Sequence, residues 1–534
     1  MSKILIAILS LLIMSNAYSK ISGTFKLNLG QQPTTLNPLS STDAYASTVQ
    51  KYVIESLLVR DPSTYKYKPA LAESWKISKD KMSYTFTIRQ GVKWHDGKPL
   101  TIDDIIFSFK AIVDPKNKYH TAHLKSYFDG LKEVKKTGEH QVTFYAKNKY
   151  FGNFSTAADL KIVPKHLYLD TSKKNIRKLN KTLIGTGPYI FKKIKRGKNL
   201  VLINNKNWWG HKVAEFKDRY NFKKIMMRFI KDPTISLQRL EKGDIDFDGL
   251  RAEDYVKRTG GKRWKTKLNK VKFQNIAPKG YGFVAWNFKN DLFKSKNVRI
   301  ALAHLMNRKL MIKKFLFGYA KPATGPWYQQ SEYADPTVKP FQFDPKKALR
   351  LLKKEGWKDT DGNNILDKVV NGKKKQFSFT ILNPSKSFLK YLTIYKEDAK
   401  KAGIDINIKY LEWNTFVKLL DEKKFEAVTL AWGAGNVDND PKQIWHSSSA
   451  GVGGSNFISY KKKNVDKLID KAREEFDKKK RIKMLRKVYR TIAADAPYLF
   501  MFNSTHNFYG VSKKIKRPKD TFNYEVGTSY WQKP

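Results

Sequence analysis

Alternation of apolar and polar residues marks the clearest local structure in the chain, between residues 84 and 113. In Tyr84–Ile88 the two classes alternate at the period of a half-buried strand, and Asp96-Gly97 is a strong turn signal. Thr101 and Asp104 then form a capping box, in which the hydroxyl and the carboxylate each accept a backbone amide proton. Apolar residues follow at helical spacing: Ile105, Ile106, Phe109, Ile112 and Val113. The pattern predicts a strand, a tight turn and a capped helix.

Strands and helices alternate along the rest of the chain, which predicts an α/β fold. We expect a strand over Phe25–Leu29, a helix over Gln50–Leu58 and the longest helix over Asn464–Ala494. Two glycines around a threonine, followed by a proline, predict a sharp passage between elements at Gly185-Thr186-Gly187-Pro188. The length of 534 residues indicates two or three domains.

Residues 1–19 have the pattern of a cleaved signal peptide. Lys3 gives a short basic start, Ile4–Met14 is apolar, and Ala17-Tyr18-Ser19 offers small residues where a signal peptidase cuts. The apolar stretch is shorter than the roughly 20 residues that cross a bilayer, so cleavage before Lys20 is favoured over an uncleaved anchor. The chain has no cysteine, which excludes disulfides, thiolate chemistry and a lipid-modified cysteine. We therefore expect a protein of a Gram-negative periplasm that is not a lipoprotein.

The net charge of +56 admits three interpretations. A nucleic-acid binder would gather its lysines and arginines with stacking aromatics, whereas here they are spread along the whole sequence, as in Lys373-Lys374-Lys375 and Lys478-Lys479-Lys480. Attraction to an anionic membrane surface or to acidic ligands is the second interpretation. A basic bias of the whole proteome is the third, and it is the one that we favour, so no nucleic-acid partner is expected.

Sequence motifs for catalysis are absent. The chain contains no Gly-x-Ser-x-Gly elbow, no His-Glu-x-x-His pair and no cysteine nucleophile. Gly91–Lys98 has one residue too many for a phosphate-binding loop and is followed by Pro99 instead of a hydroxyl residue. Asp244–Gly249 fits half of a calcium loop, but Tyr255 stands where a bidentate glutamate is needed, so an edge strand is favoured. We expect no enzyme activity, no cofactor and no metal site.

Several blocks of the sequence resemble one protein family. The segment Tyr84–Phe109 is similar to the signature of the dipeptide and oligopeptide type of extracytoplasmic solute-binding protein, family 5, the receptor component of ABC importers. Further blocks match in order and spacing over nearly all of the mature chain: Gln32–Pro38, Leu71–Trp75, Ile184–Tyr189, Val298–Leu302 with Asn307-Arg308, and Phe343–Ala348 running to Glu355-Gly356-Trp357. The sequence resembles a divergent branch of this family.

The resemblance implies a two-lobed α/β clamp of the class II periplasmic-binding-protein type, with mixed sheets and three structural domains. Lobe I is expected to be discontinuous and to comprise residues 20–65, 184–283 and 501–534. Residues 66–183 would form the small domain II and residues 284–500 would form lobe III. The crossings Gly185–Pro188 and Phe283–Phe288 are expected to act as hinges.

The implied ligand-binding residues depart from the family pattern at one point. Peptide-binding members place an aspartate against the free amine of the ligand in a Trp-x-Ala-Asp-Tyr motif, whereas here Trp432-Gly433-Ala434 is followed by Gly435-Asn436. Asp438 or Asp440 could replace that aspartate. Trp413 and Trp432 match the tryptophans that wall the family's pocket, with core packing as the alternative. The expected binding set is Gln32, Pro33, Trp413, Trp432, Gly433, Ala434, Gly435, Asn436, Asp438 and Asp440.

The function implied by the resemblance is that of a periplasmic receptor. It would capture di- or oligopeptides between its lobes and deliver them to permease subunits of an ABC importer, acting as a monomer. A receptor of the same fold for another solute, such as a nickel chelate, haem, an opine or a cell-wall peptide, is the first alternative. A secreted envelope hydrolase or scaffold is the second.

Overall fold

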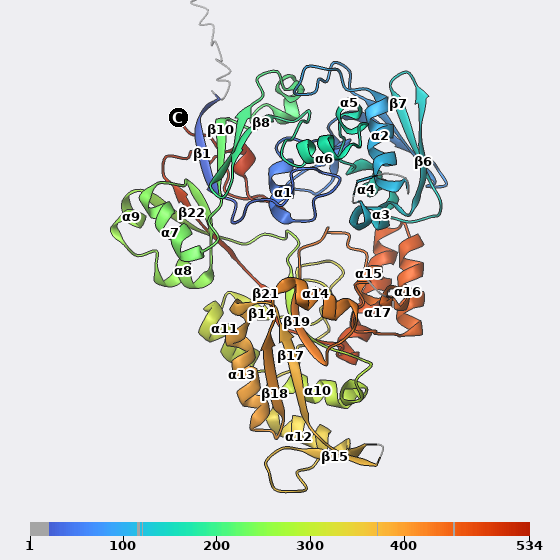
Figure 1. Cartoon of the computed structure of the whole chain (residues 1–534), viewed down its shortest axis with the longest axis vertical. Coiled ribbons are helices and arrows are strands. Elements are labelled where there is room, and N and C mark those ends of the chain that lie inside the picture. The colour runs from blue at the N-terminus through green and yellow to red at the C-terminus, as the bar shows by residue number, and fades with distance from the viewer. Residues whose placement is uncertain (1–20, 115–117, 120, 371, 452–453) are drawn as a thin grey trace, which may run out of the picture.

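The computed structural model describes residues 21–114, 118–119, 121–370, 372–451 and 454–534. The predicted signal peptide lies outside the described residues. Two bodies are visible in Figure 1, an upper body that carries two sheets and a lower lobe that carries a third large sheet. Within the described ranges no helix is both long and apolar enough to cross a bilayer.

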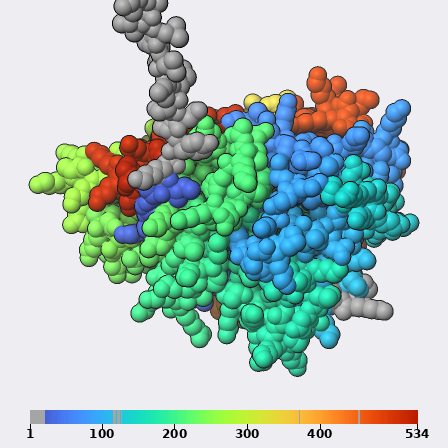
Figure 2. All heavy atoms as spheres, turned by 90° about the horizontal axis from the view of Figure 1, so that it is seen from above, coloured from blue at the N-terminus to red at the C-terminus, as the bar shows by residue number. Residues whose placement is uncertain are grey.

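A seven-stranded sheet in the upper body is assembled from three separate stretches of the chain. Its strand order is β12-β22-β11-β1-β10-β9-β8. Figure 2 shows the N-terminal stretch in dark blue, the second stretch in green and the C-terminal stretch in red, side by side on this body. The strands are β1 (Ser22–Asn28), β8 (Tyr189–Lys195), β9 (Asn199–Asn204), β10 (Phe222–Arg228), β11 (Phe247–Leu250), β12 (Leu268–Phe273) and β22 (Asn507–Ser512). Helices α1 (Ala44–Gln50), α7 (Pro233–Lys242), α8 (Ala252–Lys257) and α9 (Lys262–Thr266) accompany it.

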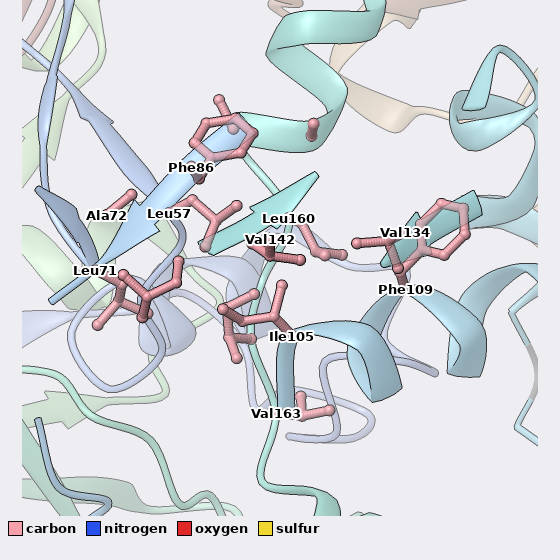
Figure 3. Close-up of a cluster of buried hydrophobic side chains, with 14 of the residues drawn as sticks. Leu57, Leu71, Ala72, Phe86, Ile105, Phe109, Val134, Val142, Leu160 and Val163 are labelled. Atoms are coloured by element: carbon pink, nitrogen blue, oxygen red, sulfur yellow. The ribbon is translucent and has the colours of Figure 1, made fainter. Parts of the chain in front are cut away.

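A four-stranded antiparallel sheet forms the rest of the upper body. Its order is β4 (Ala72–Ile77), β5 (Ser83–Ile88), β7 (Gln141–Ala146) and β6 (Leu131–Gly138), and α2 (Ile102–Val113) covers one face. Figure 3 shows Ile105 and Phe109 of α2 meeting Val142 and Val134 of the sheet. The predicted strand, turn and helix are confirmed, including the capping box. Smaller elements are β2 (Leu58–Arg60), β3 (Tyr67–Pro69), α3 (Ala122–Phe128), α4 (Asn153–Ala158), α5 (Lys165–Tyr168) and α6 (Lys173–Leu179).

The lower lobe is built on a mixed five-stranded sheet. Its order is β18 (Asp405–Tyr410), β17 (Ser378–Asn383), β19 (Ala427–Trp432), β13 (Tyr281–Trp286) and β20 (Tyr498–Phe500), with β17 parallel to β18 and β13 antiparallel to β19. Two antiparallel pairs are added: β14 (Ala320–Pro322) with the distant β21 (Phe502–Ser504), and β15 (Asp367–Val370) with β16 (Lys373–Gln376). The helices are α10 (Lys296–His304), α11 (Arg308–Leu316), α12 (Pro345–Lys354), α13 (Leu389–Lys400), α14 (Trp413–Asp421), α15 (Lys442–Trp445), α16 (Lys463–Glu474) and α17 (Lys478–Asp495).

Three sequence predictions of local structure are corrected. The long helix predicted over 464–494 is divided into α16 and α17, because the Asp477 side chain accepts the amide proton of Lys480 and starts a new helix. The helix predicted over 50–58 lies earlier in the chain, at Ala44–Gln50, because the Asp43 side chain accepts the amide proton of Ala46 and starts it there. The strand expected at an edge, β11, lies inside the sheet between β22 and β1.

The chain passes between the upper body and the lower lobe at two places. Residues 274–280 lead from β12 to β13, and residues 505–506 lead from β21 back to β22 (Figure 1). The boundary predicted at 283/284 falls inside β13, so the first passage comes earlier than predicted. The predicted hinge segment Gly185–Pro188 joins the four-stranded part to β8, so it connects two parts of the upper body and does not connect the lobes.

Candidate ligand-binding cavity between the lobes

A cavity of about 530 Å³ lies where the seven-stranded sheet faces the lower lobe. Strand register explains the position of the cavity. Strands β1 and β11 are parallel, so their carboxyl ends lie at the same edge of the sheet. The start of β22 and the end of β12 lie at that edge too. In open α/β sheets this edge is the usual place for ligands. The lining includes Gly249, Phe273, Lys279, Phe508 and Glu525 from the upper body and its crossing, and Ala434 from the lower lobe.

The segment that follows β19 brings the lower lobe to this cavity. Trp432 is the last residue of β19 and pairs with Tyr281, after which Gly433, Ala434, Gly435 and Asn436 are exposed. Of these four, Ala434 lines the cavity, and the Asn436 Oδ1 accepts a hydrogen bond from the Tyr65 hydroxyl at 3.4 Å. The predicted binding segment therefore reaches the upper body directly.

The two predicted tryptophans differ in their surroundings. Trp432 is half-buried, with its ring centroid 6.1 Å from that of Phe283 and 6.0 Å from that of Phe457. Trp413 is 52% exposed and stacks on Phe416 at 5.9 Å, at the start of α14. In Figure 1 α14 lies at the end of the lower lobe that faces the upper body. Trp432 thus packs partly into the core of its lobe, and Trp413 does not.

Asp438 and Asp440 each have a partner within the lower lobe. Asp440 pairs with the Arg473 guanidinium at 2.7 Å. Asp438 accepts a hydrogen bond from the Tyr333 hydroxyl at 2.6 Å and lies 3.9 Å from the Arg481 guanidinium. Their charges are therefore compensated without a ligand.

The two remaining predicted binding residues lie on the loop after β1. The Gln32 Oε1 accepts the amide proton of Gly197 at 2.8 Å, which ties this loop to the turn between β8 and β9. Pro33 is buried. Both lie at the carboxyl end of β1, on the side of the sheet where the cavity opens.

Contacts between the four-stranded part and the lower lobe bring the two bodies together on one side. The amide of Phe151 donates to the carbonyl of Arg473 at 2.9 Å. The guanidinium of Arg473 lies 4.3 Å over the Tyr150 ring, and that of Arg481 lies 4.2 Å over the Phe151 ring. Figure 1 shows the corresponding approach of α16 to α4. These cation–π contacts join the four-stranded part to the lower lobe.

Sequence reasoning missed two charged residues of the cavity, Lys279 and Glu525. Burial raises the pKa of Glu525, and the positive charges of Arg219 and Lys51 partly offset this effect. Burial lowers the pKa of Lys279. Neither residue belongs to a motif. Lys279 precedes the lower lobe in the chain and Glu525 follows it, so no local signal could have identified them as neighbours in one cavity.

One acidic group outside the cavity has the geometry of a cation site. Asp359, Asp361 and Asp367 lie close together beside the β15–β16 hairpin. The Lys374 ammonium already lies 2.7 Å from Asp361 and 3.4 Å from Asp367. The ammonium group of this lysine partly compensates the negative charge of the three carboxylates.

Comparison with known proteins identifies the fold. The family described as bacterial extracellular solute-binding proteins, family 5 (middle), matches residues 66–454. The chain belongs to this family. The predicted family is confirmed, and so is the two-lobed α/β fold with mixed sheets. Family 5 proteins are solute-binding receptors, and the description of the family places them outside the cytoplasm.

Similar family 5 proteins have been named for different solutes. The oligopeptide-binding protein AppA of Bacillus subtilis is 32% identical over 479 residues, which are 88% of this chain and 84% of that protein. The solved structure of AppA in complex with a nonapeptide has a TM-score of 0.79 at 29% identity and covers 96% of this chain and 99% of that one. NikZ from Campylobacter jejuni, solved with Ni(L-His), has a TM-score of 0.78 at 25% identity, with coverage of 96% and 99%.

Proposed function

We propose that this chain is the substrate-binding receptor of an ABC importer, which captures peptides between its two lobes and delivers them to a membrane permease. The observation that carries the proposal is a cavity lined by both lobes in a family 5 fold. Among the relatives described above, the higher identity is to AppA, whose structure holds a nonapeptide. This favours peptides over the nickel chelate seen in NikZ.

The chemistry of the cavity also suits a peptide. Aromatic rings of Phe273, Phe508 and Tyr509 provide apolar walls that tolerate different side chains, and Lys279 and Glu525 provide opposite charges. The exposed backbone of residues 433–436 lies at the end of a strand, where amide and carbonyl groups can pair with an extended ligand.

We infer that closure occurs by rotation of the lower lobe about residues 274–280 and 505–506. Only these two passages join the lobes within the described chain, and the contacts of Arg473 and Arg481 with Tyr150 and Phe151 form only when the lobes meet. The three-domain division remains a proposal, with lobe III beginning at β13. Export by removal of residues 1–19, a periplasmic location and a monomeric state belong to the same proposal.

Native mass spectrometry of the purified protein tests the function. After incubation with a mixture of short synthetic peptides, we expect peptide adducts whose masses equal those of the intact peptides. Small-angle scattering of the loaded protein should give a smaller radius than the empty protein, because ligand contacts made by both lobes favour the closed form. Cleaved peptides would support the hydrolase instead, and an adduct of a metal chelate or haem in place of peptides would support a receptor for another solute.

Replacement of each tryptophan tests whether a bound peptide extends beyond the cavity to Trp413 and Trp432, which are not part of its lining. We expect Trp413→Ala and Trp432→Ala each to weaken binding of a captured peptide on the order of tenfold, because each removes a large apolar surface near the ligand. Isothermal titration gives the affinities. Trp75→Ala, which removes a half-buried tryptophan of β4, serves as the control and should leave affinity unchanged. Lower thermal stability with unaltered affinity would assign Trp432 to core packing alone.

A further inference from the structure

Glu525 differs from the other acidic residues near the cavity because its charge has no close partner. Asp438 and Asp440 are compensated by Arg481 and Arg473. The Glu525 carboxylate forms neither an ion pair nor a side-chain hydrogen bond with any residue in the described part of the chain. It lines the cavity, where its side chain stays partly accessible to solvent. Its nearest opposite charges, Arg219 and Lys51, act on it only from a greater distance.

The loop that carries Glu525 is held firmly in place. The amide of Phe522 donates to the carbonyl of Glu525 at 2.7 Å, and the amide of Gly527 donates to the backbone carbonyl of Asp520 at 3.1 Å. The backbone amide of Tyr524 donates to the carbonyl of Pro62 at 3.0 Å, and the amide of Ile276 in the first passage donates to the backbone carbonyl of Asn523 at 2.9 Å. A carboxylate on such a loop is positioned before any ligand arrives, which lowers the entropic cost of binding.

A partly desolvated carboxylate without a cation is unfavourable in the empty protein. Its pKa is raised, which reflects the poor solvation of its charged form. A cationic group brought by a ligand would compensate this charge, and the resulting charge-assisted hydrogen bond would strengthen as the closing lobes exclude water. The same cavity contains Lys279, whose ammonium donates only to the Asn275 Oδ1 at 3.3 Å among described groups and has no carboxylate partner there.

We propose that Glu525 is the subsite for an ammonium-type cation of the bound peptide, in place of the aspartate that the segment after Trp432 lacks. The inference rests on the proposed peptide-binding function and names the group that is recognised. The cation is either the free N-terminus or a lysine or arginine side chain, since both present the same chemistry to a carboxylate.

Capture of matched peptide libraries tests the assignment. The first library contains peptides of about three to five residues with free N-termini and no lysine or arginine, a size suited to the cavity. The second is the same library with acetylated N-termini, and the third is the acetylated library with lysine and arginine restored. Mass spectrometry counts the peptides retained by the wild-type protein, by Glu525→Gln and by the control Glu73→Gln, which changes an exposed glutamate of β4 outside the cavity lining.

The wild-type protein is expected to prefer cationic over acetylated neutral peptides by about tenfold or more, which corresponds to one charge-assisted hydrogen bond. Glu525→Gln should lose this preference and Glu73→Gln should keep it. Preference for the first library identifies the N-terminus as the cation, and preference for the third alone identifies a basic side chain. Thermal unfolding of Glu525→Gln should match the wild type, because the side chain gives up no hydrogen bond within the described structure.

Two outcomes would overturn the assignment. Equal capture of all three libraries by the wild-type protein would show that no cation is recognised, and an undiminished preference in Glu525→Gln would place the subsite elsewhere. A wild-type protein that retains none of the libraries would instead overturn the peptide-binding function itself.

Discussion

A Gly185→Ala variant should unfold with a free energy about 3 kcal/mol lower than that of the wild type, as expected for severe overpacking against a rigid neighbour. A Cβ atom added at Gly185 would lie 1.8 Å from the carbonyl oxygen of Val53 and 2.6 Å from its carbonyl carbon. Both are backbone atoms, so no side-chain rotation relieves the contact. The backbone at Gly185 would have to move away from Val53. The hydrogen bond that the Gly187 amide donates to the same Val53 oxygen, at 3.0 Å, opposes this movement.

Denaturant unfolding of the variant measures this effect, and Gly260→Ala is its matched control. A Cβ at Gly260 meets no atom within 4 Å, and this glycine lies in the exposed connection between α8 and α9. The control should stay within about 0.5 kcal/mol of the wild type. Similar losses in both variants would mean that the glycines matter only through chain flexibility and that close packing at Gly185 is unimportant.

The buried carboxyl group of Glu55 should make the protein less stable as the pH rises from about 4.5 to about 7. Burial raises the pKa of Glu55 from 4.5 to about 7, although hydrogen bonds from Trp209, Thr186 and Trp208 and the charge of Arg89 oppose the shift. Between these two pKa values the folded state keeps the proton and the unfolded state has lost it. The protonated carboxyl group therefore stabilises the fold fully below about pH 4.5, and this stabilisation is lost as the pH rises through about 7. The difference amounts to about 3 kcal/mol.

Comparison of the wild type with Glu55→Gln isolates this contribution. Unfolding free energies are measured at about pH 5 and about pH 8, and the change with pH is compared between the two proteins, so that other titrating groups cancel. The wild type should lose about 3 kcal/mol more than the variant over this range. The variant will also lose stability at every pH, because its amide group faces the Trp208 and Trp209 donors. Equal dependence on pH would show that Glu55 is ionised throughout.

Predictions from the sequence succeeded where neighbouring residues carry the whole signal. The strand at Tyr84–Ile88 and the helix capped by Thr101 and Asp104 depend on alternation, a turn dipeptide and a capping box, which act over a few residues. The helix that begins at Pro345, with Asp344 as its N-cap, depends on the same kind of local signal. The family was recognised because several such blocks occur in order.

Predictions failed where distant segments decide the outcome. Periodicity continues across residues 475–477, so the break made by the Asp477 cap was not visible as a change of pattern. The position of β11 between β22 and β1 depends on a strand about 260 residues further along the chain, as the register shows. The segment Gly185–Pro188 was correctly expected to be a tight passage, but only the topology shows which two bodies it joins.

The sequence by itself determined the family of this protein and those local elements whose signals lie in neighbouring residues, such as the helix capped by Thr101 and Asp104. Only the tertiary structure decided which charges are available at the cavity, because a carboxylate is free or compensated according to what lies beside it in space. Arg473 lies 33 residues from Asp440 along the chain and still neutralises it, whereas Glu525 reaches the cavity from the far end of the chain and has no such partner among the described residues. Pairing of charges depends on distances of a few ångströms, and the fold alone sets those distances.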